Sequence, residues 1–256
     1  LGYNSLQSIT TNGNCVAIGY ESLKTNTAAN CTAIGYQSLY SNSTGGNNTA
    51  VGYRALYTNS TGVNGTAMGL ESLRLNTTGD HNCAFGKSAL EFNTTGTRNT
   101  AVGTFSLDAN TTASNNTAIG YNALTANTTG SVNTAVGDQA LGSNTTGSNN
   151  TGIGQGALYA NNADYNTAVG KDSLANNSTG TQNTAVGALT LDVNSTGQGN
   201  VAVGYDALTA NTTASYNTAV GSFALAANTT GEHNIAIGRA ALQANTTEGN
   251  NVAIGN

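Results

Sequence analysis

Histidine, cysteine and carboxylate side chains are the groups in this chain that could support catalysis or bind a metal. The histidines are His81 and His233, and the cysteines are Cys15, Cys31 and Cys83. No serine or cysteine has a neighbouring base, and the carboxylates form no recurring pair, so the sequence lacks the patterns of nucleophilic and acid–base catalysis. We therefore expect a non-enzyme with no catalytic residue, no cofactor and no metal site.

A second group of chemically distinctive residues is a set of asparagines followed by Ser or Thr and then Thr. This pattern accepts N-linked glycans in secreted proteins, and we consider a column of glycans along an exposed edge. The alternative is that the same residues form a turn, because Asn and Thr side chains hydrogen-bond nearby backbone. The candidate glycosylation residues are Asn42, Asn59, Asn76, Asn93, Asn110, Asn127, Asn144, Asn177, Asn194, Asn211, Asn228 and Asn245.

These residues recur because the chain repeats a unit close to N-T-A-V-G-Y-x-A-L-x-x-N-T-T-G-x-x. We number each unit from the glycine that closes A-V-G, as position 0. The step between these glycines is 17 residues, except from Gly19 to Gly35 and from Gly154 to Gly170, where it is 16. Position 4 is always Leu, position 16 is always apolar, and position 15 is Ala except at Gly152. Such a period indicates a stack of coils, each packed on its neighbours.

The columns of this repeat predict an all-β, parallel β-solenoid of about fifteen 17-residue coils. T-A-V predicts a short strand, A-L a second strand, N-T-T-G a turn, and the glycine at position 0 a corner with positive φ. We expect positions 4 and 16 to point inward and position 2 to point outward. Residues 1–256 form a single continuous array in this interpretation. Both ends fall inside a repeat without capping units, so we expect an excerpt of a longer chain.

Stacking at about 4.8 Å per coil decides which of the reactive residues can meet. His81 and His233 share position 12 but lie nine coils apart, on the order of 40 Å, so they cannot form one site. Cys15 and Cys31 share position 13 in adjacent coils, and a Cα separation of about 4.8 Å falls inside the disulfide window of roughly 4.4–6.8 Å. They are a candidate disulfide, whereas Cys83, at position 14, is expected to be free.

Two further columns are expected to form ladders. Position 13 is Asn in twelve units, and we expect each side-chain amide to bond those above and below it. Position 1 is Tyr in the first four units, which favours a stacked aromatic ladder over a strip that holds sugar rings.

Composition narrows the classes of partner. Charged residues are 7% of the chain and the net charge is −5, so no basic patch for nucleic acid exists. No apolar run approaches the roughly 20 residues that cross a bilayer, so we expect no membrane insertion in this segment.

Each coil offers about one Leu, one Val or Ile and two small side chains for burial, which is little for 17 ordered residues. Association between chains is therefore expected.

The unit N-T-A-V-G-Y-x-A-L, as at Asn116–Leu124, resembles the head repeat of trimeric autotransporter adhesins, whose motif is close to S-V-A-I-G. Cys15–Gly19 (C-V-A-I-G) and Asn251–Gly255 (N-V-A-I-G) are nearer still. The N-T-T-G version is similar to repeats of phage and bacterial tail-fibre-like proteins. This resemblance implies a left-handed parallel β-roll, packed as a homotrimer in a stiff, surface-exposed fibre.

The combined expectation is a structural and adhesive surface fibre segment on a cell, a virion or an extracellular filament. Its partners would be its own copies and a host-surface carbohydrate or protein receptor. A glycan-decorated architectural filament is the first alternative. An ice-binding solenoid is the second alternative, because regular Thr arrays also occur on such proteins.

Overall fold

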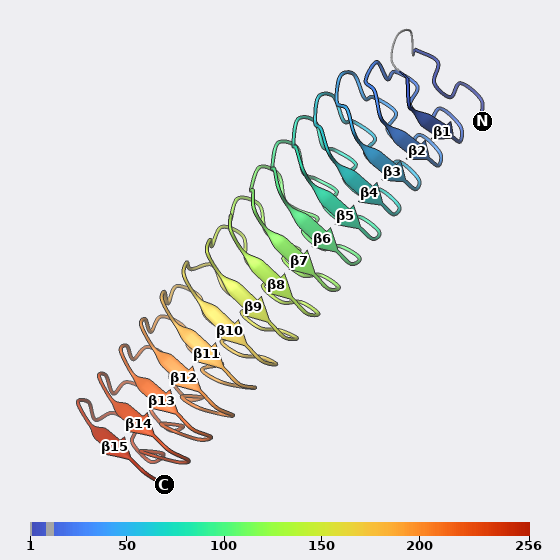
Figure 1. The fold of residues 1–256 in the computed structure, drawn as a ribbon. Coiled ribbons are helices and arrows are strands. Elements are labelled where there is room, and N and C mark those ends of the chain that lie inside the picture. The colour runs from blue at the N-terminus through green and yellow to red at the C-terminus, as the bar shows by residue number, and fades with distance from the viewer. Residues whose placement is uncertain (1, 9–12) are drawn as a thin grey trace. The chain divides into compact units, whose positions relative to one another are not determined.

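The computed structural model describes residues 2–8 and 13–256, and its regular secondary structure there consists of strands only. The chain divides into two compact units, Leu1–Ser131 and Val132–Asn256, each of which is described by itself. In each unit the coils are stacked with one short parallel strand per coil (Figure 1). The prediction of a parallel β-solenoid is confirmed. The single continuous array and the left hand of the coil stay predictions.

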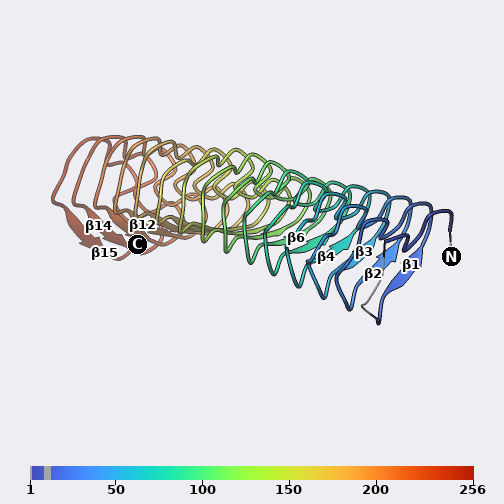
Figure 2. The same ribbon diagram turned by 90° about the horizontal axis from the view of Figure 1, so that it is seen from above.

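Each strand is the T-A-V segment of one repeat, as the sequence predicted. The first unit contains β1 (Val16–Ile18), β2 (Thr32–Ile34), β3 (Thr49–Val51), β4 (Thr66–Met68), β5 (Cys83–Phe85), β6 (Thr100–Val102) and β7 (Thr117–Ile119). The second contains β8 (Thr134–Val136), β9 (Thr151–Ile153), β10 (Thr167–Val169), β11 (Thr184–Val186), β12 (Val201–Val203), β13 (Thr218–Val220), β14 (Ile235–Ile237) and β15 (Val252–Ile254). Figure 2 shows the labelled strands of each unit along one side of its coils.

Neighbouring strands pair in register, so that equivalent residues of successive coils lie side by side. Ala101 pairs with Ala118 in the first unit, and Ala202 with Ala219 in the second. Because side chains alternate between the two faces of a strand, the Ala at position 15 points inward while positions 14 and 16 point outward. All four of these alanines are fully buried.

The expectation that position 16 points inward is therefore wrong. Ile119 is 40% exposed, whereas Leu124, at position 4, is fully buried as predicted. The interior is narrow: it is filled by the strand's Ala methyl and by Leu from the opposite side, and one strand cannot turn both Ala and its neighbour inward. Position 2 is mostly half-buried rather than fully outward, and Glu21 and Ser88 are buried there.

The predicted second strand at A-L is also wrong, because this segment is a left-handed turn. Leu124 has φ 51°, and Asn122 and Asn115, at positions 2 and 12, have φ 52° and 62°. A non-glycine residue in this region costs on the order of 1–3 kcal/mol, which the full burial of Leu offsets. The inter-coil ladder continues through the turn, since the N–H of Leu107 donates to the carbonyl of Ala123 at 3.0 Å.

The corner glycine has the positive φ that the sequence predicted. Gly86 has φ 134°, a conformation that side-chain-bearing residues rarely adopt. A Cβ at this position would lie 2.6 Å from the carbonyl oxygen of Gly103 in the next coil. Glycine is therefore required both by the local backbone and by the close approach of successive coils.

We predict that Leu124→Ala lowers the free energy of unfolding by about 2–5 kcal/mol, because it removes a fully buried side chain from an interior that cannot collapse. Asn122→Ala, two residues away in the same turn, should lower it by less than about 1 kcal/mol, since that side chain is half-exposed. Urea unfolding followed by circular dichroism measures both. Equal losses would contradict the assignment of the interior.

Candidate functional site

The best-defined chemical feature of the molecule is a ladder of buried asparagine amides at position 7. Asn110 is fully buried, and its Nδ2 donates to Oδ1 of Asn93 at 2.8 Å and to the carbonyl of Ala113 at 3.1 Å. Asn127 repeats the arrangement one coil later, donating to Oδ1 of Asn110 at 3.2 Å and to the carbonyl of Gly130 at 2.9 Å. The amide-to-amide ladder expected at position 13 is thus found at position 7.

Asparagines at position 13 bond mainly to backbone. Asn99 Nδ2 donates to the carbonyl of Ala113 at 2.8 Å, and its Oδ1 accepts the N–H of Asn116 at 3.0 Å. The carbonyl of Ala113, at position 10, therefore accepts from both Asn99 and Asn110. Sequence reasoning missed this doubly bonded carbonyl; the only signal for it is that position 10 is almost always Gly or Ala.

Burial of position 7 overturns the expectation of an exposed edge that carries glycans. A glycan on Nδ2 does not fit inside the coil, and it would replace one of the two amide hydrogens, which donate to a neighbouring amide and a carbonyl. Eleven of the twelve candidates are buried, and the twelfth, Asn245, is half-buried. The residues concerned are Asn42, Asn59, Asn76, Asn93, Asn110, Asn127, Asn144, Asn177, Asn194, Asn211, Asn228 and Asn245.

Cysteine replaces asparagine at position 13 in two adjacent coils. The N–H of Cys31 points at Sγ of Cys15 at 3.4 Å, so the sulfur takes the acceptor role of an asparagine Oδ1. The predicted proximity of the two residues is confirmed, but both thiols are free, and Cys83 is free as well. Burial raises the pKa of the Cys31 thiol, which disfavours the reactive thiolate.

The expected aromatic ladder at position 1 is present in the first unit. Tyr3, Tyr20, Tyr36 and Tyr53 stack with centroid separations of 5.6, 5.2 and 5.3 Å between successive rings. The rings lie nearly parallel, with interplanar angles of 8–13°. Because each inner face is covered by the next ring, the ladder offers ring edges and hydroxyls to solvent rather than faces for a sugar.

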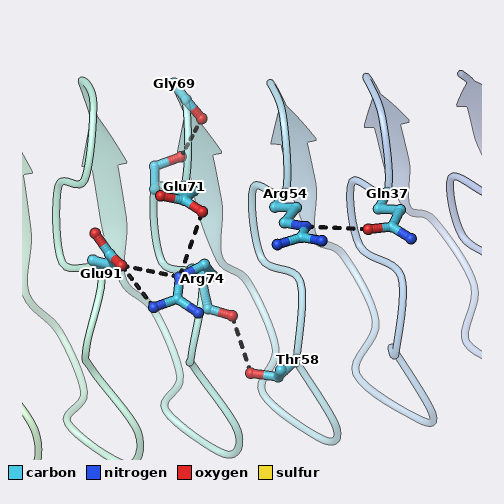
Figure 3. Close-up of polar contacts among 8 residues, drawn as sticks. Gln37, Arg54, Thr58, Gly69, Glu71, Arg74 and Glu91 are labelled. Atoms are coloured by element: carbon cyan, nitrogen blue, oxygen red, sulfur yellow. Dashed lines mark hydrogen bonds and ion pairs between the residues drawn. The ribbon is translucent and has the colours of Figure 1, made fainter. Parts of the chain in front are cut away.

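Arginine side chains bond polar side chains of neighbouring coils (Figure 3). The guanidinium of Arg54 lies 5.2 and 5.3 Å from the ring centroids of Tyr53 and Tyr57, and its Nε donates to Oε1 of Gln37 at 3.1 Å. Arg74 bonds Oε1 of Glu91 at 2.7 Å. An ion pair at the surface contributes at most about 1 kcal/mol.

The two histidines belong to different units of the chain. His81 belongs to the first unit and His233 to the second, and both are exposed. Within residues 2–8 and 13–256, no three His, Cys, Asp or Glu side chains gather where a metal ion could bind. The expectations that the chain is no enzyme and holds no metal stay predictions.

Comparison of the chain with models of known protein families and with curated proteins found no match. In the part of the chain that the structure describes, no helix has the length and apolar character needed to cross a membrane.

We predict that Asn110→Ala lowers the free energy of unfolding by at least about 2 kcal/mol, because it leaves buried amide partners unsatisfied. Thr112→Ala is the matched control: it destroys the same Asn-Thr-Thr pattern at an exposed residue and should change stability by less than about 0.5 kcal/mol. Urea unfolding of the two variants is compared with that of the parent chain. If both lose stability equally, the ladder does not hold the coils together.

Proposed function

We propose that this chain is a non-catalytic structural and adhesive segment of a surface fibre that works as an assembly of three copies. The observation that carries the proposal is a row of exposed apolar side chains at position 16, on the outer face of the strands. In the first unit the row contains Ile18, Ile34, Met68, Phe85, Val102 and Ile119, each 36–46% exposed. In the second it contains Ile153, Val186, Ile237 and Ile254.

A continuous apolar row of this kind is uncommon on soluble monomers and supports a binding face. Its side chains repeat at strand spacing, about 4.8 Å. A partner that matches this spacing over many coils must itself have the same period, which favours another copy of the chain. With 7% charged residues, the surface offers little electrostatic attraction to a different partner.

Three copies, attachment to a carbohydrate or protein receptor, and a place on a cell or virion surface are supported by the resemblance to adhesin and tail-fibre repeats. Burial of the candidate asparagines at position 7 removes the support that these residues gave to a glycan-decorated filament.

We predict that the parent chain sediments at three times the 25.6 kDa of one chain and that the double variant Val102→Lys, Ile119→Lys sediments as a folded single chain. Two charges in the apolar row oppose its burial between copies. The matched control is Thr95→Lys with Thr112→Lys, which adds the same charge to exposed turns of the same two coils and should stay trimeric. Analytical ultracentrifugation measures the mass, and a parent chain that is monomeric at all concentrations would contradict the proposal.

Ice binding is a second candidate, favoured by the same face. Most strands present Thr at position 14 and Val or Ile at position 16 outward, in two rows at regular spacing. For this function we expect a single-chain species that arrests the growth of an ice crystal, an activity that the double lysine variant loses and the control variant keeps. A face buried between copies cannot contact ice, so thermal hysteresis and sedimentation together separate the two functions.

A further inference from the structure

A cavity of about 230 Å³ opens on the surface of the second unit. It belongs to three successive coils and is formed by residues at positions 1, 2 and 5, which elsewhere vary along the chain. Its lining residues are Gln139, Gln155, Gly156, Tyr159, Asp172 and Ala175.

Two glycines that break the repeat make room for this cavity. Gly156 is the only glycine at position 2, and Gly142 is the only glycine at position 5. Cε2 of Tyr159 lies 3.1 Å from the place where a Cβ on Gly142 would be, so its ring rests on bare backbone. The missing side chain of Gly156 makes room for the carboxylate of Asp172, which would collide with a Cβ at that position. The cavity is thus a local departure from a continuous surface.

The lining combines one aromatic ring, two primary amides and one carboxylate above a floor of small residues. Tyr159 is 41% exposed, Gln139 and Gln155 are exposed, and Asp172 is half-buried. Amides and carboxylates can each bond two adjacent hydroxyl groups, and an aromatic ring covers the apolar C–H face of a sugar. We propose that this cavity binds one neutral pyranose ring, with its hydroxyls on Gln139, Gln155 and Asp172 and with Tyr159 as the apolar wall.

Charge and size favour a neutral ring over the other ligands that such a lining could take. Oδ2 of Asp172 pairs with Nζ of Lys171 at 3.0 Å, so the carboxylate's charge is already compensated and does not demand a cation. The volume lies below the roughly 300–1,000 Å³ of pockets that enclose drug-sized ligands, which suits a single ring.

This site is independent of the proposed association of copies. The cavity uses positions 1, 2 and 5, whereas the apolar row uses position 16 of the strands. A monomeric chain could bind the sugar, and a trimeric chain could fail to bind it, so the two proposals fail separately.

The test is saturation-transfer NMR on the full chain with a panel of methyl pyranosides: glucoside, galactoside, mannoside and N-acetylglucosaminide. Gly156→Asn fills the cavity and displaces the carboxylate of Asp172, which a Cβ at that position would meet. The backbone conformation allows the substitution, because Gln139 and Asp206 occupy position 2 with φ 56° and 53°. Tyr159→Ala removes the apolar wall. Tyr165→Ala, an exposed tyrosine outside the cavity, is the matched control.

We expect at least one pyranoside to bind the parent and the Tyr165→Ala chain, and its affinity to fall at least ten-fold in both Gly156→Asn and Tyr159→Ala. Tetramethylammonium serves as a cation probe and should not bind. The proposal is overturned if no pyranoside binds, if binding survives Gly156→Asn, or if the cation alone binds and is lost in that variant. Circular dichroism confirms that each variant is folded.

Discussion

The stacking of coils depends on a backbone carbonyl that, in most coils, accepts two buried amide hydrogen bonds. At Ala214 these come from Asn211 of the same coil, at 3.0 Å, and from Asn200 of the preceding coil, at 2.8 Å. Asn211 also bonds Oδ1 of Asn194, at 2.9 Å. A buried amide without a partner costs about 1–3 kcal/mol, so a coil that slipped along its neighbour would break several such bonds at once.

The same constraint explains how the array tolerates a missing residue. In the shorter unit between Gly154 and Gly170, Asn161 reaches a carbonyl two residues on, at Ala163, instead of the usual three. That carbonyl still accepts the amide of Asn150 at 2.8 Å. The deletion is absorbed within the turn, while the doubly bonded carbonyl and the strand register are kept. The short unit therefore keeps the doubly bonded carbonyl although its length differs from that of its neighbours.

With Leu, Ala and Asn fixed inside, the outward positions are free to differ from coil to coil. The first unit uses them for stacked tyrosines and for pairs such as Arg74 with Glu91. The second unit uses them for the cavity beside Tyr159. Substitutions at these outward positions leave the interior side chains unchanged. A binding site can therefore form at one coil without a change of fold.

The sequence alone determined the T-A-V strands, the glycine corners and the tyrosine ladder, because each follows from a residue type that recurs at a given position. Gly103, for example, is at a corner that only glycine accepts. The tertiary structure decided which positions of the repeat turn their side chains inward and which turn them outward. Ile119 and Leu124 are equally apolar, yet only Leu124 lies inside, because the narrow coil admits Ala118 and not its strand neighbour. Asn110 is a polar residue in a sequence typical of a turn, yet its side chain is buried, because a neighbouring coil supplies its hydrogen-bond partner. Those partners exist only once coils are stacked, so no reading of a single repeat could place them.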